Sequence, residues 1–168
     1  MSVNATNNLK LIGKNIEDLQ VISAYCQDSV VKLKDIAFLK KNRTFVMMLN
    51  RFMWEDAEKG AFRQNKRIRC AIKFDEVLEV KSKKINQKNK NRLLECLAIK
   101  CNETVNNNYE IIFFFAGGSI ITLISEFIEV VMHDLGEAWN VKYFPKHKIW
   151  MLIYLRILIK TRNGEIIG

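Results

Sequence analysis

The sequence predicts an α+β domain: an N-terminal helix, an antiparallel meander of about seven strands, and a C-terminal helix packed on the sheet. Three observations support this fold class. Short runs of alternating apolar and polar residues follow one another, separated by polar or glycine-containing turns. Helical spacing of apolar residues occurs near the two ends of this array. Strands and helices do not alternate along the chain, which argues against the βαβ units of a parallel sheet.

The N-terminal region contains a tail, a short strand and a helix. Residues 1–8 are polar, and we expect them to form a disordered tail. A strand is predicted over Leu9–Ile12. A helix over Ile16–Asp28 follows, because Asn15 is a favourable N-cap and Asp18 stands three residues later, in the capping-box position. Apolar residues then recur at helical spacing: Ile16, Leu19, Ile22 and Cys26.

After this helix, the apolar residues recur at a spacing of two instead of the helical spacing. Strands are predicted over Val30–Leu33, Ile36–Lys40 and Thr44–Phe52. The turn Lys41–Arg43 between the last two of them indicates a hairpin. The polar segment Met53–Lys66 is predicted to be a loop with room for one helical turn.

Three more strands are expected before Tyr109, and two of them are separated by a short turn. Arg67–Phe74 alternates cleanly between apolar and polar residues, and Val77–Lys83 follows it after a turn at Asp75–Glu76. The segment Lys81–Arg92 is rich in Lys and Asn and is predicted to be a solvated loop. The next strand covers Leu93–Cys101.

The segment Tyr109–Trp139 is predicted to contain a hairpin and then a helix. Tyr109–Ala116 is nearly continuous in apolar residues and Ser119–Ile124 is rich in β-branched residues, so both are predicted strands. Gly117–Gly118 between them can adopt the positive φ angles of a two-residue turn. We predict a helix over Glu126–Trp139. Its apolar face would consist of Phe127, Ile128, Val131, Leu135, Ala138 and Trp139.

A strand meander closed by a C-terminal helix that bears a late tryptophan resembles the pleckstrin-homology-type barrels. In those folds the last helix plugs the open corner between two curved sheets. The resemblance concerns the order of the elements, and a shared fold would not by itself imply a function.

The positive charge is concentrated in one fifth of the chain. Of 27 basic and 18 acidic residues, the segment Lys59–Arg92 holds 12 basic and three acidic ones, a net of +9, so the rest of the chain is neutral. Such a cluster is typical of a surface that contacts nucleic acid or another polyanion. Two other interpretations stay open: a solvated surface whose Lys and Asn content reflects AT-biased codon usage, and contact with acidic proteins.

The cysteines and histidines do not have the spacing of a metal site. The four cysteines form no CxxC pair, and the chain has two histidines. We therefore expect reduced thiols, no metal and no cofactor. No signal peptide is visible at the N-terminus. The longest apolar run, Ile149–Ile159, contains Arg156 and falls well short of the roughly 20 residues of a membrane span, so a cytoplasmic protein without membrane contact is predicted.

No catalytic residue is predicted. The glycines of FAGGS precede a strand, whereas a phosphate-binding loop precedes a helix. On the predicted C-terminal helix, Glu126, Glu129 and His133 would form a solvated outer face. A nucleophile elbow of the form GxSxG is missing from the sequence.

The most informative candidate for function is a group of basic, amide and aromatic residues around the end of the Thr44–Phe52 strand. Asn, Arg and an aromatic side chain together can contact bases or phosphates. In the alternative interpretation, Phe52 and Trp54 pack in the core, while Asn50 and Arg51 hold the following loop. The candidate binding patch consists of Asn50, Arg51, Trp54, Arg63, Lys66, Arg67 and Arg69.

A series of short motifs follows the chain in a fixed order: Leu9–Ile12, Leu49–Phe52, Trp54–Glu55, Leu97–Ile99, Phe115–Gly118, Asp134–Gly136, Trp139 and Pro145. Their order and spacing together resemble the alphaproteobacterial family designated domain of unknown function 2948. The match runs from about Leu9 to His147, most of the chain. The resemblance implies a small bacterial cytosolic protein and supplies no activity. The sequence departs from the family pattern at Phe127, where a cysteine is expected, and beyond His147.

These observations predict a single globular domain over residues 9–147 with a C-terminal extension over 148–168, helical or non-native. The favoured function is a non-enzymatic binding module that uses the basic surface. The alternative is a protein–protein adaptor or homodimer that uses the apolar tail Ile149–Ile159. An enzyme without a recognisable motif is the third hypothesis.

Overall fold

The computed structural model describes residues 8–57 and 65–142. Two α-helices, two short 3₁₀ helices and seven strands lie in these ranges; the α-helices and strands are numbered below. In chain order they are β1 (Lys10–Gly13), α1 (Ile16–Cys26), β2 (Val30–Leu39), β3 (Thr44–Phe52), α2 (Trp54–Ala57), β4 (Lys66–Lys83), β5 (Leu93–Glu103), β6 (Tyr109–Phe115) and β7 (Ile120–Asn140).

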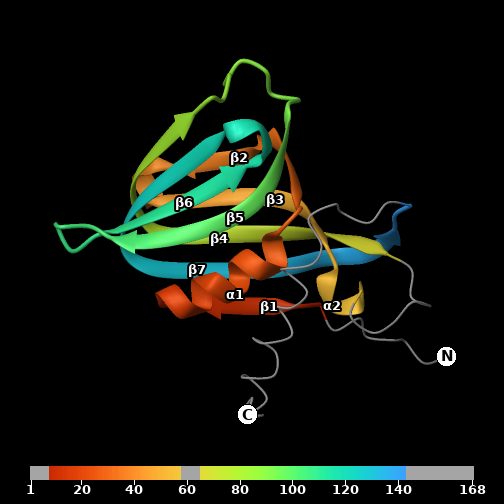
Figure 1. The fold of residues 1–168 in the computed structure, drawn as a ribbon. Coiled ribbons are helices and arrows are strands. Elements are labelled where there is room, and N and C mark those ends of the chain that lie inside the picture. The colour runs from red at the N-terminus through yellow and green to blue at the C-terminus, as the bar shows by residue number, and fades with distance from the viewer. Residues whose placement is uncertain (1–7, 58–64, 143–168) are drawn as a thin grey trace, which may run out of the picture.

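The strands form one antiparallel sheet that closes on itself (Figure 1). The strand order is β1-β7-β4-β3-β2-β5-β6, and an additional pairing of β6 with β7 joins the two sides, so β2 to β7 form a barrel. The sheet can close because the two halves of β7 pair with different strands. Ile120–Ser125 pairs with β6, whereas Val130–His133 pairs with β1. Closure removes unpaired strand edges that would otherwise invite aggregation.

Helix α1 packs against β1 and β5, and so covers the corner of the barrel between them. Leu19, Ile22 and Cys26 on its inner face are buried. The predicted N-cap is confirmed, because Asn15 Oδ1 accepts a hydrogen bond of 2.7 Å from the backbone N–H of Asp18. The helix ends at Cys26, two residues earlier than predicted, because the next residue, Gln27, has an extended ψ of 139°.

The predicted C-terminal helix Glu126–Trp139 is wrong, because this segment is the second half of strand β7. Burial alternates along it: Ile128, Val130 and Met132 are buried, and the residues between them are more exposed. Apolar residues on the outer face produced the helical spacing that suggested a helix. Pairing with β1 on one side and β4 on the other outweighed that pattern. A closing C-terminal helix of the pleckstrin-homology type is therefore not seen within residues 8–57 and 65–142, and α1 covers a barrel corner instead.

Two predicted breaks between strands are irregularities within single strands. The predicted strands Val30–Leu33 and Ile36–Lys40 form one strand, β2, which ends at Leu39 and whose pairing with β3 shifts register between Val31 and Ile36. Asp75–Glu76, predicted as a turn, lies inside β4, where Glu76 has a φ of +59° and the pairing with β7 shifts. A single left-handed residue of this kind bends a strand as a bulge without ending it.

The predicted hairpins are confirmed. The β2–β3 connection is a short 3₁₀ turn, Lys40–Asn42, followed by Arg43 in the left-handed region. The β6–β7 connection runs through Gly117 and Gly118, whose φ angles of +79° and +82° favour glycine. The loop predicted over Met53–Lys66 begins with α2, and residues 58–64 lie outside the described residues.

One hydrophobic core fills the barrel, and aromatic rings form its centre. Phe113 contacts Phe45, Phe74 and Phe115, with ring centroids 5.7 to 6.3 Å apart. In the described ranges, no helix has the length and apolarity that a membrane span requires. The predicted N-terminal tail, apart from Asn8, and the predicted C-terminal extension lie outside the described residues.

The strand structure of β7 predicts sharply different effects for two adjacent substitutions. Ile128→Ala should lower the free energy of unfolding by about 2–4 kcal/mol, because Ile128 is only 4% exposed. Phe127→Ala should cost less than about 1 kcal/mol, because Phe127 is 58% exposed. Denaturant unfolding of both variants measures this difference. Similar large losses for both would instead indicate the helix, in which the two residues share the buried face.

Candidate binding surface

The structure separates the predicted binding patch into a buried part and a surface part. Arg51 and Trp54 are fully buried, whereas Asn50, Arg67 and Arg69 lie partly exposed on the outer wall of the barrel. This separation follows from strand geometry, because successive side chains of β3 point to opposite faces. Of the remaining two, Lys66 is partly exposed at the start of β4, and Arg63 lies outside the described residues.

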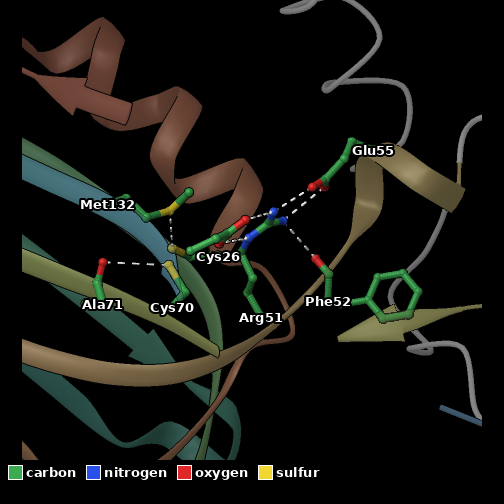
Figure 2. Close-up of polar contacts among 8 residues, drawn as sticks. Cys26, Arg51, Phe52, Glu55, Cys70, Ala71 and Met132 are labelled. Atoms are coloured by element: carbon green, nitrogen blue, oxygen red, sulfur yellow. Dashed lines mark hydrogen bonds and ion pairs between the residues drawn. The ribbon is translucent and has the colours of Figure 1, made fainter. Parts of the chain in front are cut away.

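Arg51 is held by two carboxylates inside the protein (Figure 2). Its Nε and Nη2 atoms donate to Asp134 Oδ1 and Oδ2 at 2.7 and 2.6 Å, respectively. Its Nη1 and Nη2 atoms also donate to Glu55 Oε2 and Oε1 at 3.0 and 2.5 Å. The guanidinium lies over the ring of Tyr25, with its Cζ atom 5.6 Å from the ring centroid. We call Arg51, Glu55 and Asp134 the Arg51 cluster; it joins β3, α2 and β7.

Arg51 stays ionised because its hydrogen bonds favour the charged form. Burial alone would lower the pKa of Arg51, but the hydrogen bonds to Asp134 and Glu55 outweigh it and hold the pKa above the ordinary value. Neither Arg51 nor Asp134 is open to solvent, with side-chain exposures of 0% and 2%. The cluster therefore stabilises the fold and does not present Arg51 to a ligand from solution.

Trp54 and Phe52 also lie in the interior. This is what the alternative interpretation predicted, in which both residues pack in the core. Trp54 Nε1 donates to the carbonyl oxygen of Gln27 at 2.9 Å, and the two rings meet edge to face with centroids 4.7 Å apart. These contacts attach α2 to the end of α1 and to β3.

Three buried thiols lie in the same interior. Cys26 Sγ is 3.6 Å from Met132 Sδ, and Figure 2 shows both residues near Cys70. Burial raises the pKa of Cys26 and of Cys70 far above the ordinary value, and raises the pKa of Cys96 to about 12. Thiols in this state are poor nucleophiles and poor metal ligands at neutral pH. Within the part of the chain that the structure describes, no group of three or more His, Cys, Asp or Glu residues could hold a metal ion.

The exposed part of the patch is built on neighbouring positions of β3 and β4. Asn50 is the cross-strand partner of Arg69, and Arg69 Nη1 donates to Asn50 Oδ1 at 3.2 Å. Arg67 Nη1 donates to the carbonyl oxygens of Asp28 and Asn50 at 2.9 and 3.1 Å. Burial lowers the pKa of Arg67, and the charges of Asp28 and Glu95 oppose that effect. An arginine nevertheless remains protonated at physiological pH.

A hollow of about 310 Å³ opens on the outer wall next to Asn50 and Arg69. It exists because β2 leaves β3 there: the four residues Lys32–Asp35 stand opposite the single residue Met48 in the pairing register. We call this hollow the β2–β3 groove. It is lined by Val30, Lys32, Lys34, Asp35, Asn50, Arg69 and Leu93.

Lys32 and Lys34 are binding candidates that sequence reasoning missed. Both are exposed, and neither forms an ion pair within residues 8–57 and 65–142. The alternation in VVKLKD was the available signal, since buried Val31 and Leu33 place both lysines on the outer face. The carboxylate of Asp35 is paired with Arg69 at 3.3 Å.

The Lys81–Arg92 loop lies beside the same part of β2. The backbone N–H groups of Leu33 and Lys34 donate to the carbonyl oxygens of Arg92 and Lys90, each at 2.9 Å. Basic residues that are 50 or more positions apart in sequence are thus brought to one side of the barrel.

The Arg51 cluster predicts a large stability loss when one partner is removed. Arg51→Met should lower the free energy of unfolding by about 3–5 kcal/mol, because two carboxylates lose their cation in the interior. Removing a second partner as well, in Arg51→Met/Asp134→Leu, should cost less than the sum of the two single changes. Denaturant unfolding provides the measurement. Lys73→Met, which breaks an exposed pair with Asp75 at 3.1 Å, is the control and should cost less than about 1 kcal/mol.

Comparison with known protein families identifies one match, to the family described as "Protein of unknown function (DUF2948)". The family model matches residues 9–147, which include every described strand and helix. Comparison with curated proteins gave no match, and comparison with solved structures also gave none. Because the family model spans most of the chain, including the Arg51 cluster and the β2–β3 groove, the protein belongs to the DUF2948 family.

Proposed function

We propose that this protein is a non-enzymatic module that binds single-stranded nucleic acid on the outer wall of its barrel. The observation that carries the proposal is the β2–β3 groove, which Lys32, Lys34 and Arg69 line together with Asn50. Lysine and arginine side chains attract phosphates and release their counterions. The groove is a defined concavity, whereas scattered surface lysines would provide only a diffuse positive field.

The polar groups of the groove are arranged to meet a polyanion. Asn50 Oδ1 accepts from Arg69, which directs the amide nitrogen of Asn50 away from that guanidinium. Among the described residues this nitrogen has no protein acceptor, so it can donate to a phosphate or to a base edge. Lys32 and Lys34 stand on the other side of the groove as point charges for the backbone.

Trp139 favours a single strand over a duplex. It is the cross-strand partner of Arg67 and is 40% exposed, although the sequence suggested that it belongs to the core. An exposed indole beside an arginine can stack on an unpaired base, and bases are available for stacking only when they are not inside a duplex. Arg67, Arg69 and Asn50 form a continuous row from Trp139 to the groove.

The other hypotheses remain predictions. The apolar tail Ile149–Ile159 of the adaptor or homodimer hypothesis lies outside the described residues. For an enzyme, the Arg51 cluster brings three charged groups together, but its Arg51 and Asp134 are closed to solvent. Cytoplasmic location and acidic protein partners are likewise expectations from composition.

Removing the two groove lysines should weaken binding and its dependence on salt. For Lys32→Ala/Lys34→Ala, we expect roughly tenfold weaker binding of a labelled single-stranded RNA or DNA at low salt. The slope of log K against log salt should become smaller by about 1.4, or about 0.7 for each lost phosphate contact. Fluorescence anisotropy over a salt series measures both quantities.

The control for this experiment is Lys10→Ala/Lys14→Ala, which removes the same charge from exposed positions near α1. It should change the affinity less than threefold. Equal losses in both double variants would show that net charge, and not the groove, determines binding. Failure of the unchanged protein to bind any RNA or DNA at low salt would contradict the proposed function itself.

Replacing Trp139 should separate stacking from charge. Trp139→Ala is expected to weaken binding of a single strand by about fivefold to a hundredfold while leaving the salt slope unchanged, because stacking releases no counterions. Phe127→Ala, another exposed aromatic position on β7, is the matched control and should bind like the unchanged protein. Equal binding of a duplex, together with no effect of Trp139→Ala, would exclude the single-strand preference but not binding in the groove.

A further inference from the structure

Strand β5 has an unpaired edge in its second half. Residues 93–95 pair with β2 on one side, and residues 98–103 pair with β6 on the other side. On the side away from β6, residues 99–103 meet no further strand in the part of the chain that the structure describes. Helix α1 packs beside β5 there (Figure 1). An unpaired edge is a template for another extended segment.

The pairing of β5 identifies the backbone groups that this edge offers. The N–H group of Ile99 donates to Ser23 Oγ at 2.8 Å, so the backbone of Ile99 faces α1. Backbone groups alternate between the two edges of a strand, and the pairing with β6 is regular from Ala98 onward. The N–H and C=O groups of Cys101 therefore face the same edge as those of Ile99. Among the described residues, no backbone group pairs with them.

A groove of about 340 Å³ lies between this edge and α1. We call it the α1–β5 groove. One face of α1 lines it, including Ile16, Leu19 and Ser23, and residues 98–102 of β5 line it from the other side. An extended segment in this groove would meet hydrogen-bonding groups on β5 and apolar side chains on α1 at the same time.

The chain itself carries a segment that suits the groove. Residues 143–168 follow the described part, and Ile149–Ile159 within them reads IWMLIYLRILI, with one charge in eleven residues. Isoleucine, tyrosine and tryptophan favour strands, and no proline or glycine interrupts the run. Left in water, such a run is an aggregation hazard. Covering it releases free energy in proportion to the apolar area removed from water.

The segment is long enough to reach the groove from where the described chain ends. Lys142 follows Val141, whose N–H group donates to the carbonyl oxygen of Asn65 at 2.9 Å. The 26 residues beyond Lys142 span up to about 90 Å when extended, about three times the diameter of a small domain. A tethered segment also has an effective concentration on the order of millimolar, which favours it over a separate partner peptide.

We propose that the α1–β5 groove is a strand-addition site and that this protein's own segment Ile149–Ile159 occupies it. The segment pairs with the free edge of β5 at Cys101 and packs apolar side chains against α1. One contact thus covers both the unpaired edge and the apolar run. The inference does not rest on the proposed nucleic-acid binding, because no residue lines both the α1–β5 groove and the β2–β3 groove.

Disulfide formation with Cys101 tests the proposal in the whole chain. Cys101 lines the groove and is partly exposed, whereas the other three cysteines are buried and residues 143–168 contain none. Cysteine is introduced at one position at a time, from Met151→Cys to Ile157→Cys. Oxidised glutathione is added in alkaline buffer, because burial raises the pKa of Cys101 to about 11.

We expect disulfides within one molecule at alternate positions of the segment, because every second side chain of a strand lies on the same side. Paired strands hold opposite Cα atoms about 5.5 Å apart, which a disulfide can bridge. Cys101→Ser should abolish every cross-link. Cys101→Ser/Glu79→Cys moves the thiol to an exposed position of β4 outside the groove, and cross-links should form at least tenfold more slowly.

Four outcomes of the cross-linking would overturn the proposal. Cross-links at every position would indicate random encounters, and a spacing of three to four would indicate a helix. Cross-links only between two molecules would assign the groove to a second copy of the chain. The absence of any cross-link to Cys101 would leave the groove without this occupant.

Amide hydrogen exchange gives an independent readout. The N–H group of Cys101 should exchange at least tenfold faster in Ile153→Pro/Leu155→Pro than in the unchanged protein, because two prolines break the added strand that protects it. The N–H group of Ile99 should keep its exchange rate, since Ser23 Oγ accepts from it within the domain. Equal exchange of the Cys101 amide in both proteins would also contradict the proposal.

Discussion

The buried ion pair between Arg51 and Asp134, completed by Glu55, is the interaction on which the rest of the barrel depends. A charged guanidinium is costly to bury unless its donors are satisfied, and here four hydrogen bonds to two carboxylates satisfy them. The partners lie on β3, β7 and α2, so the pair fixes these elements relative to one another. Because side chains alternate along β3, the same pair that directs Arg51 inward directs Asn50 outward, onto the wall that carries the β2–β3 groove.

The long strands β4 and β7 determine where the surface features lie. They pair along almost their whole length, from Lys66–Asn140 to Lys83–Ile120, and the irregularities in this ladder bend the sheet into a barrel. Where β2 cannot follow β3 around the bend, it separates from β3 and leaves the β2–β3 groove on the outer wall. This candidate site thus arises from closure of the sheet, and it does not interrupt the core that Phe45, Phe74 and Phe113 fill.

Local signals predicted much of the fold. The capping residue Asn15, the glycine turn at Gly117–Gly118 and the clean alternation of Arg67–Phe74 each act within a few residues, and the structure confirms each of them. Local signals could not predict that the second half of β7 is a strand. Phe127, Val131 and Leu135 are apolar although they face outward, so the sequence carries a helical spacing that only the pairing with β1 and β4 overrides. Val131 and Leu135 are partly covered on that outer face.

The sequence by itself determined the antiparallel fold class, the first helix, most strands and the concentration of positive charge, because period, caps and composition are local properties. Only the tertiary structure decided which residues of LNRFMW face solvent. Arg51 meets Asp134 across 83 positions of sequence, and that contact removes Arg51 from the surface. Likewise, Lys32 and Lys34 reach Arg69 and the Lys81–Arg92 loop only because β2 pairs with β5 and leaves β3. Which strands become neighbours depends on the energy of the whole closed barrel. A short window of sequence therefore cannot determine the strand pairing.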